Sequence, residues 1–191
     1  MKPPPSLERH VSRHVTIGPH DLLVLDGLFA DADIASLFKF VKQLPYRLND
    51  YDSEQSSHVL HWKAELPVAM AEGTPNLREC IHAAKALAAP APLVLERAHV
   101  NLELYGDMLF PHQDLELGVT AVYYANPVWE ETWQGETVFY KDGEPAHAVL
   151  PKPGRLVVFD ADIVHRVGVP SRECYVPRIS VAFKFTRPEP C

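Results

Sequence analysis

The sequence lacks an apolar run long enough to cross a membrane, since a spanning helix needs about 20 predominantly apolar residues. It also lacks a basic surplus: 18 Lys and Arg face 25 Asp and Glu, and the formal net charge is -7. A protein that binds nucleic acid usually carries such a surplus, because it must neutralise phosphates. We therefore expect neither a membrane nor DNA or RNA as a partner.

Cysteine is scarce as well. The three cysteines are Cys80, Cys174 and Cys191, and none lies in a CxxC pair. This number and spacing argue against a disulfide framework and against a cysteine zinc site. The first 19 residues are polar and Pro-rich and have no apolar stretch of the kind a signal peptide contains. We expect a cytoplasmic location.

The chain is long and apolar enough to bury one sizeable core, with 191 residues of which 47% are hydrophobic. It contains no internal repeat and no long linker. We predict a polar, Pro-rich and loosely held N-terminal arm over residues 1–20 and a single domain over residues 21–191. The oligomeric state is left open by the sequence.

Two helices are predicted in the N-terminal half. The first follows Asp31, a suitable N-cap, has apolar residues at helical spacing and ends before Pro45. The second begins at Thr74 and Pro75, with threonine as the cap and proline at the first helical position. It extends through an Ala-rich stretch to about Ala89.

The C-terminal half consists of strand-like runs separated by Gly, Pro and Asp. The runs are LERAHVNLELY, GVTAVYYAN, ETVFY, HAVLP, GRLVVFD, HRVGV and RISVAFKF. Two helices followed by many short strands predict an α+β, mainly β fold. We expect a double-stranded β-helix, or jelly-roll barrel, with the N-terminal helices buttressing one face. An ordinary β-sandwich without a site fits the same periodicity.

One short segment has the pattern of a metal site, His112-x-Asp114 in FPHQD. In an extended chain, residues two apart point to the same side, so an imidazole and a carboxylate can reach one ion. His165, after GRLVVFD, offers a third ligand. Two histidines and one carboxylate on one face of a metal are typical of non-haem Fe(II) oxygenases. We assign other histidines to ordinary core or surface positions: His58, His61, His82 and His147.

From about Val100 to Phe185 the chain resembles the 2-oxoglutarate/Fe(II) oxygenases of the prolyl-hydroxylase-like group. The matching pieces follow the order of that family: NLELYG, FPHQD, GVTAVYYAN, WQGETVFY, PKPGRLVVFDADIVHRVG and PRISVAFKF. The resemblance implies that His112, Asp114 and His165 hold Fe(II). It also implies 2-oxoglutarate as the co-substrate and O2 as the oxidant.

The resemblance further implies that Arg178 binds the distal carboxylate of 2-oxoglutarate. A guanidinium suits this role because its planar fork can pair with both carboxylate oxygens. Arg166 and Arg172 also follow His165 and are the competing candidates. We favour Arg178 because it begins an apolar strand, where a charge needs a partner.

Two tyrosines are further candidates for the co-substrate pocket. Tyr124 lies in VYYAN, where related oxygen-sensing prolyl hydroxylases carry a tyrosine beside the same carboxylate, and Tyr123 would face the other way. Tyr105 precedes the metal-binding segment and is expected to line the pocket. For either tyrosine the alternative is an ordinary aromatic position in the core.

The chain departs from the family at two places. Gln134 and Gly135 stand where the family often has two glycines, and we expect Gly135 to keep the turn. The interval between Tyr105 and His112 is shorter than in the prolyl hydroxylases, which puts a prolyl substrate in question but not the iron chemistry.

By this resemblance we expect a dioxygenase that hydroxylates an unactivated C–H bond and releases succinate and CO2. The substrate would be a small molecule, an amino acid or a biosynthetic intermediate. The alternatives are a peptidyl or protein hydroxylase of the prolyl type and a non-catalytic sensor of metal or 2-oxoglutarate. A zinc hydrolase would need a general base, for which Glu116 and Glu136 are the nearby candidates. The segments 45–67 and 127–135 are candidates for a substrate lid.

Overall fold

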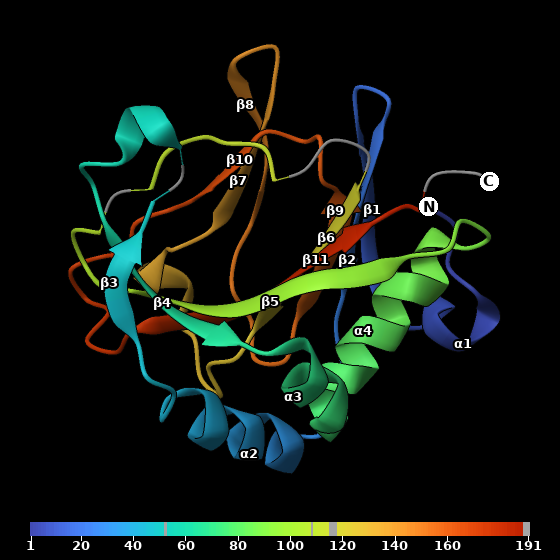
Figure 1. The fold of residues 1–191 in the computed structure, drawn as a ribbon, viewed down its shortest axis with the longest axis horizontal. Coiled ribbons are helices and arrows are strands. Elements are labelled where there is room, and N and C mark those ends of the chain that lie inside the picture. The colour runs from blue at the N-terminus through green and yellow to red at the C-terminus, as the bar shows by residue number, and fades with distance from the viewer. Residues whose placement is uncertain (52, 108, 115–117, 189–191) are drawn as a thin grey trace.

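A computed structural model describes residues 1–51, 53–107, 109–114 and 118–188, and these form two antiparallel sheets (Figure 1). The larger sheet has the strand order β1-β2-β9-β6-β11-β5-β4-β3, and the smaller has the order β10-β7-β8. In chain order the strands are β1 (Val11–Ile17), β2 (His20–Leu25), β3 (Arg47–Asp50), β4 (His61–Leu66), β5 (Val94–Glu103), β6 (Gly118–Tyr124), β7 (Thr137–Lys141), β8 (Glu144–Val149), β9 (Leu156–Asp160), β10 (His165–Val167) and β11 (Arg178–Thr186). The predicted strand-like runs therefore all contain strands, and the jelly-roll fold class is confirmed.

The two faces of the larger sheet bury different layers, because side chains alternate along each strand. On one side the sheet packs on helices α2 (Asp31–Val41), α3 (Val68–Gly73) and α4 (Pro75–Ala88), which lie together in Figure 1. Tyr123 and Phe183 belong to this layer. On the other side the smaller sheet contributes Phe139, whose ring lies 5.0 Å from that of Phe159. The interior between the two sheets is where the barrel can hold a ligand.

Both predicted helices are present, with small changes at their ends. Helix α4 begins at Pro75 with Thr74 as its N-cap residue, as predicted. Helix α2 has Ala30 and not Asp31 at the N-cap, so Asp31 lies in the first turn, where a negative charge favours the positive end of the helix dipole. None of the helices in the described ranges is both long and apolar enough to span a bilayer.

Two segments of the N-terminal half are more regular than predicted. Residues 1–20 are not a loose arm, because helix α1 (Pro5–Glu8) is followed by β1, which pairs with β2 along its length. Leu7 and Ile17 are buried, and their burial anchors the segment. Residues 45–67 contain β3 and β4, which extend the larger sheet beyond β5, together with a short 3-10 helix over Glu54–Ser56. In both segments, pairing with a neighbouring strand makes a polar stretch regular, although its local sequence pattern did not predict a strand.

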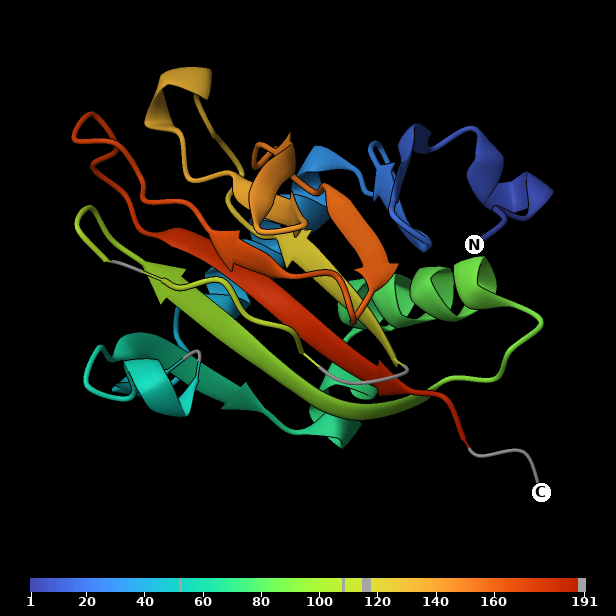
Figure 2. The ribbon, with the colours of Figure 1, turned by 90° about the horizontal axis from the view of Figure 1, so that it is seen from above.

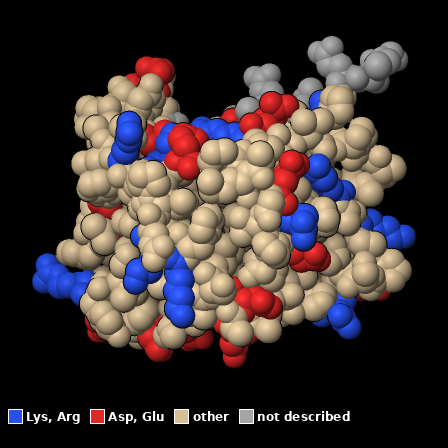
Figure 3. Space-filling view, turned by 60° about the horizontal axis from the view of Figure 1, so that its bottom comes forward, with Lys and Arg blue, Asp and Glu red and all other residues tan. Residues whose placement is uncertain are grey.

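The helical side of the molecule carries charges of both signs. Figure 3 turns this side toward the viewer and shows Lys and Arg interspersed with Asp and Glu on the visible face. Interspersed charges give no extended basic field for a phosphate backbone on that face.

The turn before β9 yields a stability prediction, because it packs on α2. Gly154 has φ +70°, and a Cβ there would lie 2.6 Å from Cδ1 of Ile34. Gly154→Ala should therefore lower the free energy of unfolding by about 2–4 kcal/mol, through the left-handed backbone and the overlap together. Gly143→Ala is the matched control, since Gly143 has φ +82° and nothing within 4 Å of a Cβ. It should cost about 1–2 kcal/mol, and urea unfolding measures both. If the two variants lose the same unfolding free energy, the Ile34 side chain moves aside without an energetic cost.

Candidate active site

The two parts of the predicted metal site are joined by backbone pairing. His112 and Asp114 lie between β5 and β6, and His165 begins β10. The backbone N–H of His112 donates to the carbonyl of His165 at 3.0 Å, and the reverse bond is 2.9 Å long. The N–H of Asp114 donates to the carbonyl of Ala161 at 3.3 Å. This pairing brings residues some fifty positions apart in the chain to one point.

The three side chains meet there with their ligating atoms within 4.8 Å of one another. Nε2 of His112 lies 3.6 Å from Oδ1 of Asp114, and Nε2 of His165 lies 3.5 Å from Oδ2. Each imidazole directs Nδ1 at a backbone carbonyl, that of Phe110 at 3.0 Å and that of Ile163 at 2.9 Å. A protonated Nδ1 in that bond leaves the lone pair on Nε2 for a metal.

The protonation states also suit a metal. Burial lowers the pKa of His165 to about 4, so its imidazole is neutral at neutral pH. Burial raises the pKa of the Asp114 carboxyl, but the positive charge of Lys184, with hydrogen bonds to the carboxylate, outweighs burial and holds that pKa well below its usual range. Two imidazole nitrogens and one carboxylate form a donor set that fits Fe(II). The residues present therefore fit the group that the resemblance implied.

Two residues that the sequence reading did not single out hold the Asp114 carboxylate. The hydroxyl of Thr120, on β6, donates to Oδ2 of Asp114 at 2.6 Å. The ammonium group of Lys184, on β11, forms an ion pair with the same oxygen. Thr120 fixes the carboxylate rotamer, and Lys184 balances its charge. A metal ion would compete with Lys184 for Oδ2.

The triad opens into a cavity of about 200 Å³ between the two sheets. Its lining includes Thr137, Val167, Arg178 and Ser180. A polar wall of the cavity comes from β3, β4 and β5 and the segment after β3: Asp50, Tyr51, His61, Arg97, His99 and Asn101. His61 was assigned to an ordinary position, and this is corrected by its buried place in the cavity wall. The error arose because the pairing of β4 with β5 could not be read from the sequence.

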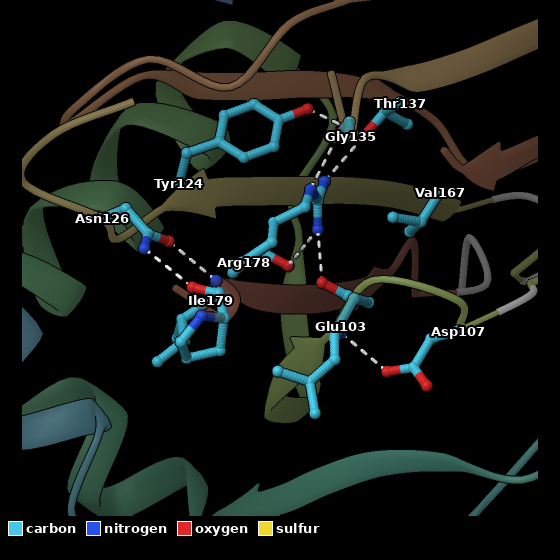
Figure 4. Close-up of polar contacts among 12 residues, drawn as sticks. Glu103, Asp107, Tyr124, Asn126, Gly135, Thr137, Val167, Arg178 and Ile179 are labelled. Atoms are coloured by element: carbon cyan, nitrogen blue, oxygen red, sulfur yellow. Dashed lines mark hydrogen bonds and ion pairs between the residues drawn. The ribbon is translucent and has the colours of Figure 1, made fainter. Parts of the chain in front are cut away.

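Arg178 is 1% exposed and enters the cavity from the start of β11 (Figure 4). Its Nε donates to the carbonyl of Gly135 at 2.8 Å, and Nη1 donates to Oε2 of Glu103 at 2.8 Å and to Oγ of Ser180 at 3.2 Å. Nη2 donates to Oγ1 of Thr137 at 3.3 Å. Burial lowers the pKa of the guanidinium, but the charge of Glu103 outweighs burial and raises it, so Arg178 is a cation.

The start of β11 is clamped by Asn126, another residue that the sequence reading missed. Its Oδ1 accepts the N–H of Ile179 at 2.8 Å, and its Nδ2 donates to the carbonyl of Pro177 at 2.9 Å. Gly135 has φ +73° and keeps the turn beside Arg178, as expected, while Gln134 adopts φ +55°. The turn and the clamp together fix where the guanidinium points.

Comparison with known proteins agrees with this geometry. Residues 100–186 match the sequence profile of the 2OG-Fe(II) oxygenase superfamily. This part of the chain is therefore similar to the 2OG-Fe(II) oxygenases, as the resemblance implied. The superfamily takes its name from Fe(II) and 2-oxoglutarate, the cofactors that the triad and Arg178 suit. No curated protein sequence matches the chain.

Solved structures show that the fold extends over most of the chain. A 2OG-Fe(II) oxygenase family oxidoreductase from Burkholderia pseudomallei superposes with a TM-score of 0.67 at 16% identity, covering 87% of this chain and 86% of that one. A Pseudomonas putida prolyl-4-hydroxylase gives 0.64 at 20% identity, covering 90% and 94%. The epimerase SnoN from nogalamycin biosynthesis gives 0.68 at 17% identity, covering 95% and 83%. At these identities the likeness shows the shared jelly-roll fold.

Within this oxygenase fold the two predicted tyrosines differ in position. Tyr124 is buried, its hydroxyl lies 2.7 Å from Oγ1 of Thr137, and its ring centroid lies 5.0 Å from the guanidinium carbon of Arg178. Tyr105 is 53% exposed and does not line the cavity, so the expectation for it was wrong. It lies beyond the end of β5, in a turn, and its ring contacts Arg172.

The arginines that competed with Arg178 lie elsewhere. Nε of Arg166 donates to the hydroxyl of Tyr140 at 2.7 Å, and Arg172 is close to the exposed Tyr105. Neither is among the described residues that line the cavity, whereas Arg178 and Arg97 are. Of the three candidates, Arg178 is therefore the guanidinium that the oxygenase cavity contains.

The two candidate lid segments also differ. Segment 45–67 supplies Asp50, Tyr51 and His61 to the cavity wall. In segment 127–135, Trp129 packs edge-on against Trp133, with ring centroids 5.4 Å apart, and neither lines the cavity. Trp129 instead donates to the carbonyl of Gln134 at 3.0 Å and so supports the turn beside Arg178.

The candidate bases for zinc hydrolysis do not support that alternative. Glu116 lies outside the described residues. Glu136 packs against Gly168 and is not one of the described residues that line the cavity. Metal-assisted hydrolysis needs a base within reach of the metal-bound water.

Proposed function

We propose that this protein is an Fe(II)- and 2-oxoglutarate-dependent dioxygenase that hydroxylates an unactivated C–H bond of a small polar molecule, such as an amino acid or a biosynthetic intermediate. One observation carries the proposal. His112, Asp114, His165 and Arg178 line the same cavity of about 200 Å³. A metal ion and an oxo-dicarboxylate could therefore be held in contact there.

The residues take the following roles in this proposal. Bound Fe(II) and 2-oxoglutarate together with O2 supply the oxidation of the C–H bond, while 2-oxoglutarate is cleaved to succinate and CO2. His112, Asp114 and His165 would hold the ion from one face. Arg178 would bind and orient the distal carboxylate of 2-oxoglutarate. The Asp114 carboxylate would occupy the coordination position that a halide would need, which favours hydroxylation over halogenation.

The polar cavity wall supports a small polar substrate. Nδ1 of His61, Nδ1 of His99 and Oδ1 of Asn101 are buried and have no hydrogen-bond partner among the described residues. Buried polar atoms are normally satisfied, so these three are suited to bind polar groups of a ligand. Burial, with the nearby charges of Lys184 and Arg97, holds the pKa of His99 well below its usual value and keeps its imidazole neutral.

Structures with bound ligands illustrate both substrate classes. HygX from Streptomyces hygroscopicus was solved with nickel, 2-oxoglutarate and hygromycin B, and the epimerase SnoN with Fe3+, alpha ketoglutarate and nogalamycin RO. A prolyl hydroxylase from Trichoplax adhaerens was solved with a peptide fragment. A peptide hydroxylase of the prolyl type is therefore the second candidate, but the buried polar atoms of the cavity wall favour a small polar molecule.

Succinate release tests the proposal. Protein loaded anaerobically with Fe(II) is given 2-oxoglutarate, O2 and a panel of amino acids and polar metabolites. We expect succinate in step with a product that gains one oxygen atom by mass spectrometry, and no chlorinated product when chloride is added. Protein loaded with Zn(II) is the control and should form neither.

Other outcomes distinguish the alternatives. Product from a peptide panel alone would establish a peptide hydroxylase. Binding of metal and 2-oxoglutarate without succinate, with every compound and peptide, would indicate a sensor and contradict catalysis.

A further inference from the structure

Glu103 places a second carboxylate at the position where Arg178 is to bind the co-substrate. The two residues are cross-strand partners on β5 and β11, the long strands that lie side by side in Figure 2. Each side chain is 1% exposed, and Nη1 of Arg178 lies 2.8 Å from Oε2 of Glu103 (Figure 4). The inference drawn from this pair rests on the proposed function.

The hydrogen bonds of Arg178 leave too few donors for a bidentate carboxylate. A guanidinium has five N–H groups. The bonds to Gly135, Glu103, Ser180 and Thr137 use four of them, including both on Nη1. Within the described part of the chain, one hydrogen on Nη2 is left. A ligand carboxylate that bridges Nη1 and Nη2 must therefore weaken the hold of Glu103 or Ser180.

The net charge of the buried site indicates that Glu103 must change its protonation state when a second carboxylate binds. Arg178 and Glu103 together are neutral, so a second carboxylate would leave one net negative charge in a buried site. Oε1 of Glu103 is also buried and has no hydrogen-bond partner among the described residues. A proton on Oε1 would restore neutrality and turn this unpartnered atom into a donor toward the incoming carboxylate.

We propose that Glu103 takes up one proton when a dicarboxylate co-substrate binds Arg178, so that the affinity for the co-substrate falls as the pH rises. In the absence of co-substrate, Glu103 is the ionised partner of Arg178. In its presence, the protonated Glu103 and the co-substrate carboxylate both contact the guanidinium, and Oε1–H of Glu103 donates to that carboxylate. Glu103 thus couples co-substrate binding to pH and selects against dianionic ligands in alkaline conditions.

The groups around Glu103 are consistent with this role. Burial raises the pKa of Glu103 above its usual value, and Asp107 acts in the same direction. Arg178 and His61 act in the opposite direction, and Nε2 of His61 lies 3.4 Å from Oδ2 of Asp50. Burial and the charge of Glu103 raise the pKa of Tyr46, whose hydroxyl stays neutral. A second anion at Arg178 would shift Glu103 further toward the protonated form.

Calorimetric titration of 2-oxoglutarate into Mn(II)-loaded protein tests the proposal without turnover. Titrations in two buffers of different ionisation enthalpy count the protons taken up. We expect close to one proton for the wild type and a Kd that rises up to about tenfold per pH unit above neutrality. Glu103→Gln should bind without this uptake, with a nearly constant Kd, and at pH 8 about tenfold or more tightly than the wild type.

Matched controls keep the outcomes distinct. Glu96→Gln changes an exposed carboxylate on the same strand, outside the cavity, and should behave as the wild type. Pyruvate lacks the distal carboxylate, so its affinity should be unaffected by Glu103→Gln and independent of this proton. Binding of 2-oxoglutarate without proton uptake in the wild type, or weaker binding by Glu103→Gln, would overturn the role of Glu103. If neither oxo acid binds the metal-loaded protein, the proposed function itself fails.

Discussion

Replacing Asp114 with alanine should reduce the affinity for Mn(II) or Fe(II) by at least about 100-fold, because the site loses its one anionic ligand. Asp114 is the carboxylate that lies 3.6 Å and 3.5 Å from the Nε2 atoms of His112 and His165. Two imidazoles alone hold a hard divalent ion weakly, and hydroxylation should be lost with the metal. Titration of Mn(II), followed by electron paramagnetic resonance, measures the change without catalysis.

Asp26→Ala is the matched control for that variant. Asp26 also pairs with a buried cation, at 2.7 Å from Nε of Arg155, but it is not among the described residues that line the cavity. Its loss should reduce stability and leave Mn(II) affinity unchanged. If Asp114→Ala binds Mn(II) as tightly as the wild type, the carboxylate is not a ligand and the triad assignment is wrong.

Arg178→Gln should have two large effects with separate causes. It removes the cation that pairs with the distal carboxylate, which should cost about 2–5 kcal/mol of co-substrate binding, roughly 30-fold to several thousand-fold in Kd. It also leaves the Glu103 carboxylate buried without its cation, which should lower the free energy of unfolding by about 3–5 kcal/mol. Titration of 2-oxoglutarate into Mn(II)-loaded protein and urea unfolding measure the two effects.

The double variant Arg178→Gln/Glu103→Gln separates these effects. Two neutral amides can hydrogen-bond to each other, so stability should largely return, while co-substrate affinity should not. Mn(II) affinity should stay unchanged in both variants, because neither residue contacts the triad. An unchanged Kd for 2-oxoglutarate in Arg178→Gln would contradict the assignment and move the role to Lys184 or Arg97, which also line the cavity.

Much of the fold followed from local pattern. Strand-forming runs bounded by Gly, Pro and Asp located every strand from β5 to β11, and Thr74-Pro75 located the start of α4. These signals are local, since alternation, caps and turn residues act over a few neighbours. Strands β1, β3 and β4 were missed because their residues are polar, and pairing with a neighbouring strand is what makes them regular.

In the candidate site, too, some residues could be named from the sequence and others could not. The spacing of His112 and Asp114, together with the resemblance around His165 and Arg178, named residues that the structure brings to one cavity. Tyr105 was placed wrongly because β5 ends at Glu103, and the turn that follows leaves the Tyr105 side chain exposed.

These four residues could be named from the amino-acid order, through the spacing of His112 and Asp114 and the resemblance around His165 and Arg178. Their electrostatic partners could not. Glu103 meets Arg178, and Lys184 meets Asp114, across strands that are distant in the chain. Strand register brings these pairs together. Burial makes the pairing energetically important, since a charge removed from water is costly without a counter-charge nearby. Such pairing is a property of the folded interior, and no local pattern encodes it.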